Sequence, residues 1–201
     1  GLVKPDTGKM LLNGQRYTPG SPSEARKAGI AMVFQHFSLF EALSVAENIS
    51  LGMENPPNQS KLAKKIKSVS NSYGLPLEPS KTVGSLSAGE RQRVEIIRCL
   101  LQEPKLLIMD EPTSVLTPQE VKILFTTLFK LKSEGTSILY ISHKLEEIRT
   151  LCDTATILRL GKKVETCIPK KTSAVELAEM MVGSSIQIPQ QKKRQTGKIL
   201  L

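Results

Sequence analysis

The sequence predicts an α/β fold with a largely parallel sheet. Three short, continuously apolar runs, at residues 30–34, 106–109 and 137–141, have the length and composition of buried strands. Segments with helix-capping residues and helical periodicity separate these runs, and strands that alternate with helices form parallel sheets. Apolar residues make up 39% of the 201 residues and aromatic residues only 4%. We therefore expect a core built mainly from Leu, Ile and Val.

Helix-start signals mark most of the segments between the strands. The pattern Ser/Thr-x-x-Glu, in which the first side chain caps the helix and the glutamate bonds back to it, begins at Ser21, Ser87 and Thr117. A Gly or a Pro ends each of these segments, because neither residue continues a helix well. The predicted helices are 21–29, a short one from Ser44, 61–73, 87–103, 117–134, 144–151 and 173–182.

Short strands are also expected outside the three apolar runs. Asn13-Gly14 between two short runs predicts a hairpin over residues 9–18, since both residues tolerate the left-handed backbone of a two-residue turn. Strands at 155–160 and 163–167 are expected on either side of a turn at Gly161.

The chain carries a net charge of +9, from 28 Lys and Arg against 19 Asp and Glu. Its lysines cluster at 61–67 and 192–194, and neither cluster is interleaved with the aromatic residues that stack on bases. We interpret the clusters as a solvated helix face and a linker, and expect no nucleic-acid partner. No apolar run approaches the roughly 18 residues of a membrane-spanning helix, so we expect none of this sequence to cross a bilayer.

The cysteine pattern favours reduced thiols in a cytosolic protein. Cys99, Cys152 and Cys167 are scattered and odd in number, without the spacing of a zinc site or a disulfide framework.

Each of the three apolar runs ends in polar residues that suit phosphate chemistry. They are Gln35, the pair Asp110-Glu111, and His143. Ligands of α/β sheets bind outside the carboxyl ends of the strands. The Asp110 carboxylate suits Mg²⁺, and Glu111 suits the activation of a water molecule as general base. Gln35 offers an oxygen to Mg²⁺ or to the water, while His143 can bond to a phosphate and hold Glu111 in place.

These residues are part of several longer sequence motifs, which follow one another in the order found in one family of ATPases. The stretch Leu86–Arg93, LSAGERQR, resembles the LSGGQ signature of ABC-type ATPases. Leu106–Thr113, LLIMDEPT, resembles their Walker B motif with its catalytic glutamate. Ser114–Thr117 resembles the D-loop, Gln35 the Q-loop and His143 the H-loop.

The resemblance implies a P-loop NTPase-like, mostly parallel sheet with a helical signature subdomain, truncated at the N-terminus. One partial ATPase domain would span residues 1–183, with the helical subdomain at about 44–102. The implied cofactors are ATP and Mg²⁺. The implied metal ligands are Asp110 and Gln35, and the implied catalytic residues are Glu111, His143 and Gln35.

In this family the signature motif faces the γ-phosphate of ATP held on a second domain. The residues implied in that contact are Ser87, Ala88, Gly89 and Glu90, with Ser114 and Thr117 of the D-loop. Ser87 caps a helix whose N-terminus carries partial positive charge and free N–H groups, and Gly89 would let the backbone come close to an anion. Ala88 and Glu90 depart from LSGGQ, and Glu90 would add negative charge near the phosphate.

At a second position the sequence departs from the usual motif of the family and resembles one of its subgroups. Thr117 stands where the D-loop usually ends in Asp, as in sugar and nucleoside uptake importers, whose ATPase subunit carries two such domains in tandem. The implied partners are a second ABC domain, transmembrane permease subunits and, indirectly, an extracytoplasmic substrate-binding protein. The permease would dock on the stretch after Gln35, which contains Phe37, Leu39, Phe40 and Leu43. The implied location is the cytoplasmic face of the cell membrane.

One motif of the family does not occur. The sequence contains no G-x-x-x-x-G-K-[ST], the loop whose N–H groups and Lys cradle phosphates. The family places that loop just upstream of the Gly-Leu-x-x-Pro-x-x-Gly motif found here at Gly1–Gly8. We therefore expect the chain to begin just after the Walker A helix and to be inactive alone. Residues 184–196 would be a linker, and 197–201 the start of a second ABC domain.

Two other function classes account for part of the pattern. A soluble ABC-type ATPase acting on ribosomes or nucleic acid would explain the positive charge, but no stretch between Gln35 and Ser87 is long enough for a coiled-coil insertion. A non-catalytic ABC-like interaction module would explain the missing phosphate loop, but it would need none of Asp110, Glu111 and His143. The favoured interpretation is the ATP-hydrolysing subunit of an importer for nucleosides or sugars.

Overall fold

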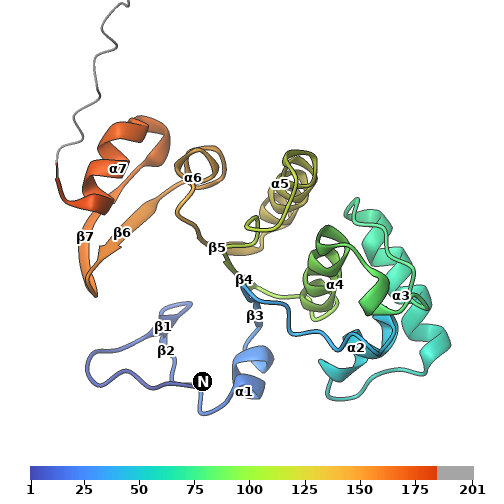
Figure 1. The fold of residues 1–201 in the computed structure, drawn as a ribbon. Helices are drawn as coiled ribbons and strands as arrows, with labels where there is room; N and C mark the ends of the chain where they lie inside the picture. The colour runs from blue at the N-terminus through green and yellow to red at the C-terminus, as the bar shows by residue number, and fades with distance from the viewer. Residues whose placement is uncertain (185–201) are drawn as a thin grey trace, which may run out of the picture. The chain divides into compact units, whose positions relative to one another are not determined.

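The computed structural model describes residues 1–184, which form two compact units (Figure 1). The first unit runs from Gly1 to His143, and the second begins at Lys144. The elements of the first unit are β1 (Leu11–Leu12), β2 (Gln15–Arg16), α1 (Pro22–Lys27), β3 (Ile30–Val33), α2 (Val45–Leu51), α3 (Gln59–Ser72), the 3₁₀ turn η1 (Val83–Ser85), α4 (Ala88–Leu100), β4 (Leu106–Asp110), α5 (Pro118–Ser133) and β5 (Ser137–Ile141).

The centre of the first unit is a parallel three-stranded sheet in the order β3-β4-β5. Val33 pairs with Met109 on one side of β4, and Asp110 pairs with Ile141 on the other. All three strands therefore end at the same edge of the sheet. The predicted α/β class with a largely parallel sheet is confirmed, since helices α1, α4 and α5 contact these strands.

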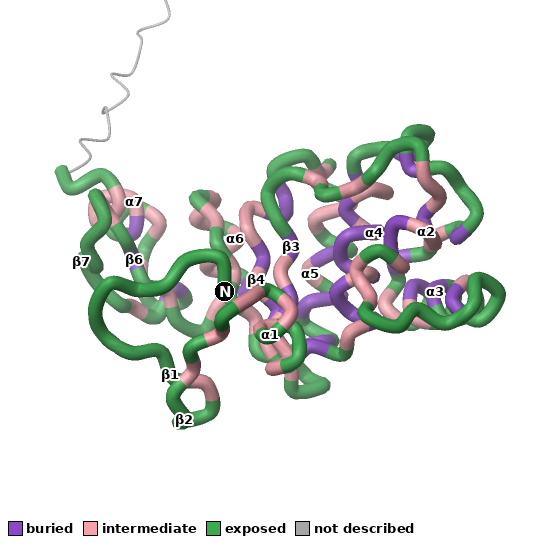
Figure 2. The backbone as a smooth tube through the Cα atoms, turned by 90° about the horizontal axis from the view of Figure 1, so that it is seen from below, coloured by how far each residue is buried: buried purple, intermediate pink, exposed green. Residues whose placement is uncertain are grey.

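Burial alternates from residue to residue along the strands of this sheet (Figure 2). Val33, Leu107 and Met109 on one face are fully buried, whereas Leu139 and Ile141 on the other are 52% and 44% exposed. The prediction that 137–141 is a buried strand is therefore wrong, because its residues alternate between exposed and intermediate burial and none of them is buried. Successive side chains of a strand point to opposite faces, and among the described residues the face with Val33, Leu107 and Met109 is the better covered of the two. The predicted strand 30–34 is also too long, because Phe34 lies past its end and is 41% exposed.

Three helices between β3 and β4 pack against one another. Helices α2, α3 and α4 are in mutual contact and bury apolar side chains between them. The buried apolar residues on α2, α3 and the first part of α4 include Val45, Ile49, Leu62, Ile66, Val94 and Ile97. Helix α3 begins two residues before the predicted start at Lys61, because the Asn58 side chain accepts a hydrogen bond from the Lys61 N–H at 2.9 Å. The lysines of α3 lie on its exposed side, as predicted for a solvated face.

The predicted caps and the first hairpin are confirmed. Ser21, Ser87 and Thr117 each accept a hydrogen bond from the glutamate N–H three residues later. Strands β1 and β2 pair antiparallel, and both residues of the turn between them, Asn13 and Gly14, have positive φ angles of 52° and 78°.

The second unit contains an antiparallel hairpin and two α-helices. Its elements are α6 (Leu145–Leu151), β6 (Ala155–Arg159), β7 (Lys162–Cys167), the 3₁₀ turn η2 (Pro169–Lys171) and α7 (Ala174–Val182). The turn between the strands is at Leu160-Gly161, and α7 ends at Gly183 with φ 85°, as the sequence predicts. Apart from Ser184, the predicted linker and the predicted start of a second domain lie outside the described residues.

Among residues 1–184, the structure contains no helix with the length and apolar character needed to cross a membrane.

Candidate functional site

The carboxyl edge of the sheet brings together three of the predicted site residues. Gln35 lies two residues after Val33, the end of β3. Glu111 follows directly on Asp110, the end of β4, and His143 lies two residues after Ile141, the end of β5. Because the strands are parallel and adjacent, their carboxyl ends meet at this edge. Asp110 is the last residue of β4 and is half-buried, while the Gln35 side chain is exposed.

Glu111 and His143 are in direct contact. The Nδ1 atom of His143 lies 2.7 Å from Oε1 of Glu111, within hydrogen-bond distance. The Glu111 side chain is 24% exposed and that of His143 is 64% exposed. The carboxylate is therefore oriented by the neighbouring strand and still open to water on one side.

The backbone at Glu111 is held in an unusual conformation. Its φ angle is 45°, in the left-handed region that side-chain-bearing residues rarely adopt. The N–H of Glu111 donates to the Ile141 carbonyl at 2.9 Å, so the pairing of β4 with β5 continues one residue past the strand end. Such strain concentrates at functional sites, where it costs about 1–3 kcal/mol.

The D-loop follows directly as a series of short turns. The Ser114 N–H donates to the Glu111 carbonyl at 3.2 Å, and the Leu116 N–H donates to the carbonyl of buried Thr113 at 3.3 Å. Thr117 then caps α5 and forms reciprocal hydrogen bonds with Glu120. Ser114 and Thr117 are both exposed at the ends of this segment.

The signature motif forms the start of α4. The Ser87 hydroxyl accepts from the Glu90 N–H at 3.2 Å, and the Ser87 N–H donates to Oε2 of Glu90 at 2.9 Å. Ser87 and Ala88 are exposed, whereas Gly89 is buried. The N-terminus of this 13-residue helix carries partial positive charge beside an exposed hydroxyl, which is an arrangement that favours anions.

The extra carboxylate of Glu90 has partners within the chain. Its Oε1 forms an ion pair with the Lys81 ammonium at 2.9 Å, while Oε2 closes the helix cap. The Lys81 ammonium and the Ser87 N–H hold the pKa of the Glu90 carboxyl below its usual range. The negative charge expected from the sequence is therefore present, but Lys81 balances it locally.

The segment after Gln35 is clamped to α4 by a buried ion pair. Glu95 is 1% exposed and pairs with Arg98. Its Oε1 accepts from the Ser38 N–H at 2.7 Å, and the Arg98 guanidinium donates to the Ser38 carbonyl at 3.2 Å. Burial raises the pKa of Glu95, against the opposing effects of the Arg98 charge and the Ser38 N–H.

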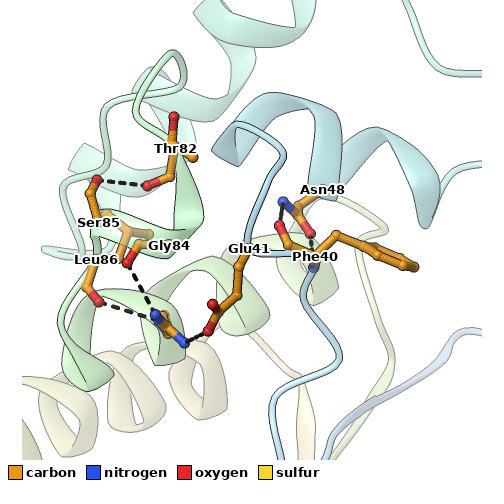
Figure 3. A network of polar contacts seen from close by, with 8 residues as sticks. Phe40, Glu41, Asn48, Thr82, Gly84, Ser85 and Leu86 are labelled. Atoms are coloured by element: carbon orange, nitrogen blue, oxygen red, sulfur yellow. Dashed lines mark hydrogen bonds and ion pairs between the residues drawn. The ribbon is translucent and has the colours of Figure 1, made fainter.

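Two further side chains hold the same segment (Figure 3). Buried Asn48 bonds to both the N–H and the carbonyl of Phe40, at 2.7 Å and 3.0 Å. Arg91 of α4 pairs with Glu41 at 2.6 Å and also donates to the carbonyls of Gly84 and of Leu86, the first residue of the signature motif. The Gln35 segment and the signature helix are therefore joined through several polar contacts.

Sequence reasoning missed these supporting residues, which are Lys81, Arg91, Glu95, Arg98 and Asn48. One signal for Glu95 was available, because it lies between Val94 and Ile96 on the buried side of a predicted amphipathic helix. An ionisable residue at such a position is almost always paired. No local pattern points to Lys81, which reaches Glu90 from a preceding loop.

The residues present fit one end of a bound Mg-ATP. Carboxylate and amide oxygens at the sheet edge, from Asp110, Glu111 and Gln35, are the ligand type that Mg²⁺ prefers. The sequence has no glycine-rich loop with a Lys for the remaining phosphates. The fit therefore covers the metal, the attacking water and the terminal phosphate only.

Comparison with known proteins shows the family of this chain. The model of the ABC transporter family matches residues 1–114, more than half of the chain. This chain belongs to the ABC transporter family. A solved structure of cbiO1 from Clostridium perfringens, part of the ABC transporter complex cbiONQ, matches it with a TM-score of 0.71 and 28% identity, covering 90% of this chain and 72% of that one.

Curated members of the ABC transporter family are closer in sequence. The nucleoside import ATP-binding protein NupA of Lactococcus lactis subsp. cremoris is 41% identical over 96% of this chain, and 39% of its own length is covered. The ribose import ATP-binding protein RbsA of Geobacillus kaustophilus is 37% identical over 98% of this chain, with 41% of its length covered. The chain thus spans about two fifths of the length of these relatives.

Proposed function

We propose that this chain is part of the ATP-binding and ATP-hydrolysing subunit of an ABC importer for nucleosides or sugars. The observation that carries the proposal is the Glu111–His143 contact at the carboxyl edge of the sheet, beside Asp110 and Gln35. The names of the relatives, which refer to nucleoside and ribose import, support the choice of solute class.

The chain's own residues would act on the terminal phosphate and the attacking water. Asp110 and Gln35 would hold Mg²⁺, which neutralises phosphate charge when bound. Glu111 would accept a proton from the water as general base, and His143 would keep the Glu111 carboxylate in position through Nδ1. The left-handed backbone at Glu111 supports this role, because it aims the carboxylate toward the end of β5.

The signature and D-loop residues would act on a second ATPase domain. Ser87, Ala88 and Gly89 at the start of α4 would face ATP bound on that domain, next to Ser114 and Thr117. Since Lys81 and the cap occupy the oxygens of Glu90, that carboxylate would support the helix start.

The partners would be those of an importer at the cytoplasmic face of a membrane. Transmembrane permease subunits would dock on the segment after Gln35, where Phe40 is 62% exposed although Asn48 bonds to its backbone on both sides. An exposed aromatic side chain on an anchored backbone suits a protein contact. An extracytoplasmic binding protein would act through those subunits.

The substitution Glu111→Gln in the longer protein tests the proposal. The amide keeps the size and can still bond to His143, but it cannot take the proton of the water. We expect kcat for ATP hydrolysis to fall at least about 100-fold with ATP affinity retained. The control is Glu103→Gln, since the Glu103 side chain is 87% exposed and outside the site. Turnover near that of the control would contradict the role of Glu111.

A further inference from the structure

The signature glycine is buried against a carboxylate from another helix. A Cβ atom at Gly89 would collide with Oε1 and Cδ of the Glu120 carboxylate. The φ angle of Gly89 is not positive, so the backbone conformation does not demand glycine there. The space for a side chain is instead filled by Glu120, near the start of α5.

Hydrogen bonds from Thr117, the capping residue of the same helix, hold the Glu120 carboxylate in this position. Its Oε2 accepts from the N–H and from the hydroxyl of Thr117, both at 2.9 Å. The Thr117 hydroxyl in turn accepts from the Glu120 N–H at 3.3 Å. Moving the carboxylate away from Gly89 would therefore break the two hydrogen bonds that Thr117, at the end of the D-loop, donates to Oε2.

The residues around Gly89 and the Glu120 carboxylate also come from helices α4 and α5. A small cavity between α4 and α5 is lined by Gly89, Gln92 and Arg93 of one helix and by Glu120 and Leu124 of the other. The hydrogen bonds from Thr117 hold the pKa of the Glu120 carboxyl below its usual range, with a further contribution from the Arg93 charge. The group in contact with Gly89 is therefore an ionised carboxylate at neutral pH.

We propose that Glu120 is a positioning residue that locks the signature motif to the D-loop within one domain. This inference rests on the proposed ATPase function and assigns Glu120 a role within it. The Glu120 carboxylate fixes the spacing between Thr117 and Gly89. Thr117 is the capping residue of α5, and Gly89 lies two positions after the capping residue of α4. Both segments then reach a partner domain as one rigid unit. Glycine is needed at 89 because any side chain there displaces Glu120.

The test is a double-mutant cycle in the longer protein, with Gly89→Ala, Glu120→Ala and the pair together. The added methyl group should push the carboxylate off Thr117 and misplace the D-loop. We expect Gly89→Ala to lower kcat on the order of tenfold to a hundredfold, with KM for ATP within about twofold. In the Glu120→Ala background the same change should cost less than about twofold, because the clashing group is gone. Glu120→Gln should retain most of the activity, since the amide oxygen still accepts from Thr117.

A matched control comes from another glycine beside a capping glutamate. At Gly20 a Cβ would lie 3.4 Å from Glu24, an ordinary contact, so Gly20→Ala and Glu24→Ala should show no coupling. Equal losses from Gly89→Ala with and without Glu120 would overturn the proposal, and so would full activity of Gly89→Ala.

Thermal unfolding of the same variants separates this inference from the proposed function. We expect Gly89→Ala to lower the melting temperature of the domain only when Glu120 is present. A wild-type protein without ATPase activity would refute the proposed function and still allow this coupling to be measured. An active wild-type protein with additive effects on both kcat and melting temperature would refute the inference alone.

Discussion

Replacing Arg98 with Met should destabilise the domain by leaving a carboxylate buried without its counter-ion. The Glu95 side chain is 1% exposed, and in the variant its only remaining partner among the contacts described above is the Ser38 N–H at 2.7 Å. Breaking a buried ion pair from one side costs about 3–5 kcal/mol. Arg98 is itself 16% exposed, so water can reach the vacated place, and we expect a loss near 3 kcal/mol.

The second step of this prediction restores stability without restoring the charge pair. Adding Glu95→Gln to Arg98→Met removes the buried charge and keeps an oxygen that accepts from the Ser38 N–H. We therefore expect the double variant to regain most of the loss, to within about 1–1.5 kcal/mol of wild type, the worth of the missing Arg98–Ser38 bond. The measurement is urea unfolding of the transition that belongs to this domain.

The pH dependence of the Arg98→Met variant provides an independent check. Burial already raises the pKa of Glu95 in the folded protein, and removing Arg98 takes away an influence that lowers it. A folded pKa above the unfolded value near 4.3 means that the folded state holds the proton more tightly. Stability of the variant should therefore fall as pH rises from about 4.3 through the folded pKa. A variant as stable as wild type at pH 8, or a double variant no more stable than Arg98→Met, would refute the reasoning.

Three more predictions concern other parts of the domain. Ser87→Arg in the longer protein should abolish ATP turnover while the same domain still binds one ATP, because the added cation fills the place of the partner's phosphate. Normal turnover would contradict the assignment of Ser87 to the signature motif. Residues 1–201 alone should show no micromolar affinity for Mg-ATP in calorimetric titration, since they supply no cradle for the α- and β-phosphates; tight binding would reveal a phosphate site elsewhere. Asn48→Ala should cost about 2–4 kcal/mol in urea unfolding, because both backbone groups of Phe40 lose their partner; a change below about 0.5 kcal/mol would show that water replaces the side chain.

Much of the candidate site follows from local sequence. Each capping box involves residues only three apart, so Ser87 with Glu90 and Thr117 with Glu120 could be recognised without any tertiary information. The meeting of Glu111 and His143 also follows from the pattern. Glu111 comes one position and His143 two positions after the ends of adjacent parallel strands, and adjacent parallel strands bring their ends together.

Contacts between distant segments required the fold. The Lys81–Glu90 pair, the Glu95–Arg98 clamp on Ser38 and the Glu120 carboxylate against Gly89 join positions whose proximity no periodicity specifies. The sequence also could not tell which face of the sheet is covered. A continuous apolar run is compatible with burial on both sides, yet Leu139 and Ile141 are exposed.

The sequence by itself determined the elements, their caps and the motifs of the candidate site, because hydrogen bonds and side-chain periodicity act within a few residues. Only the tertiary structure decided how those residues are held. The fold places Glu111 in a left-handed backbone, balances Glu90 with Lys81 and fills the space at Gly89 with Glu120. These features depend on which surfaces pack together, and packing is a property of the folded chain as a whole.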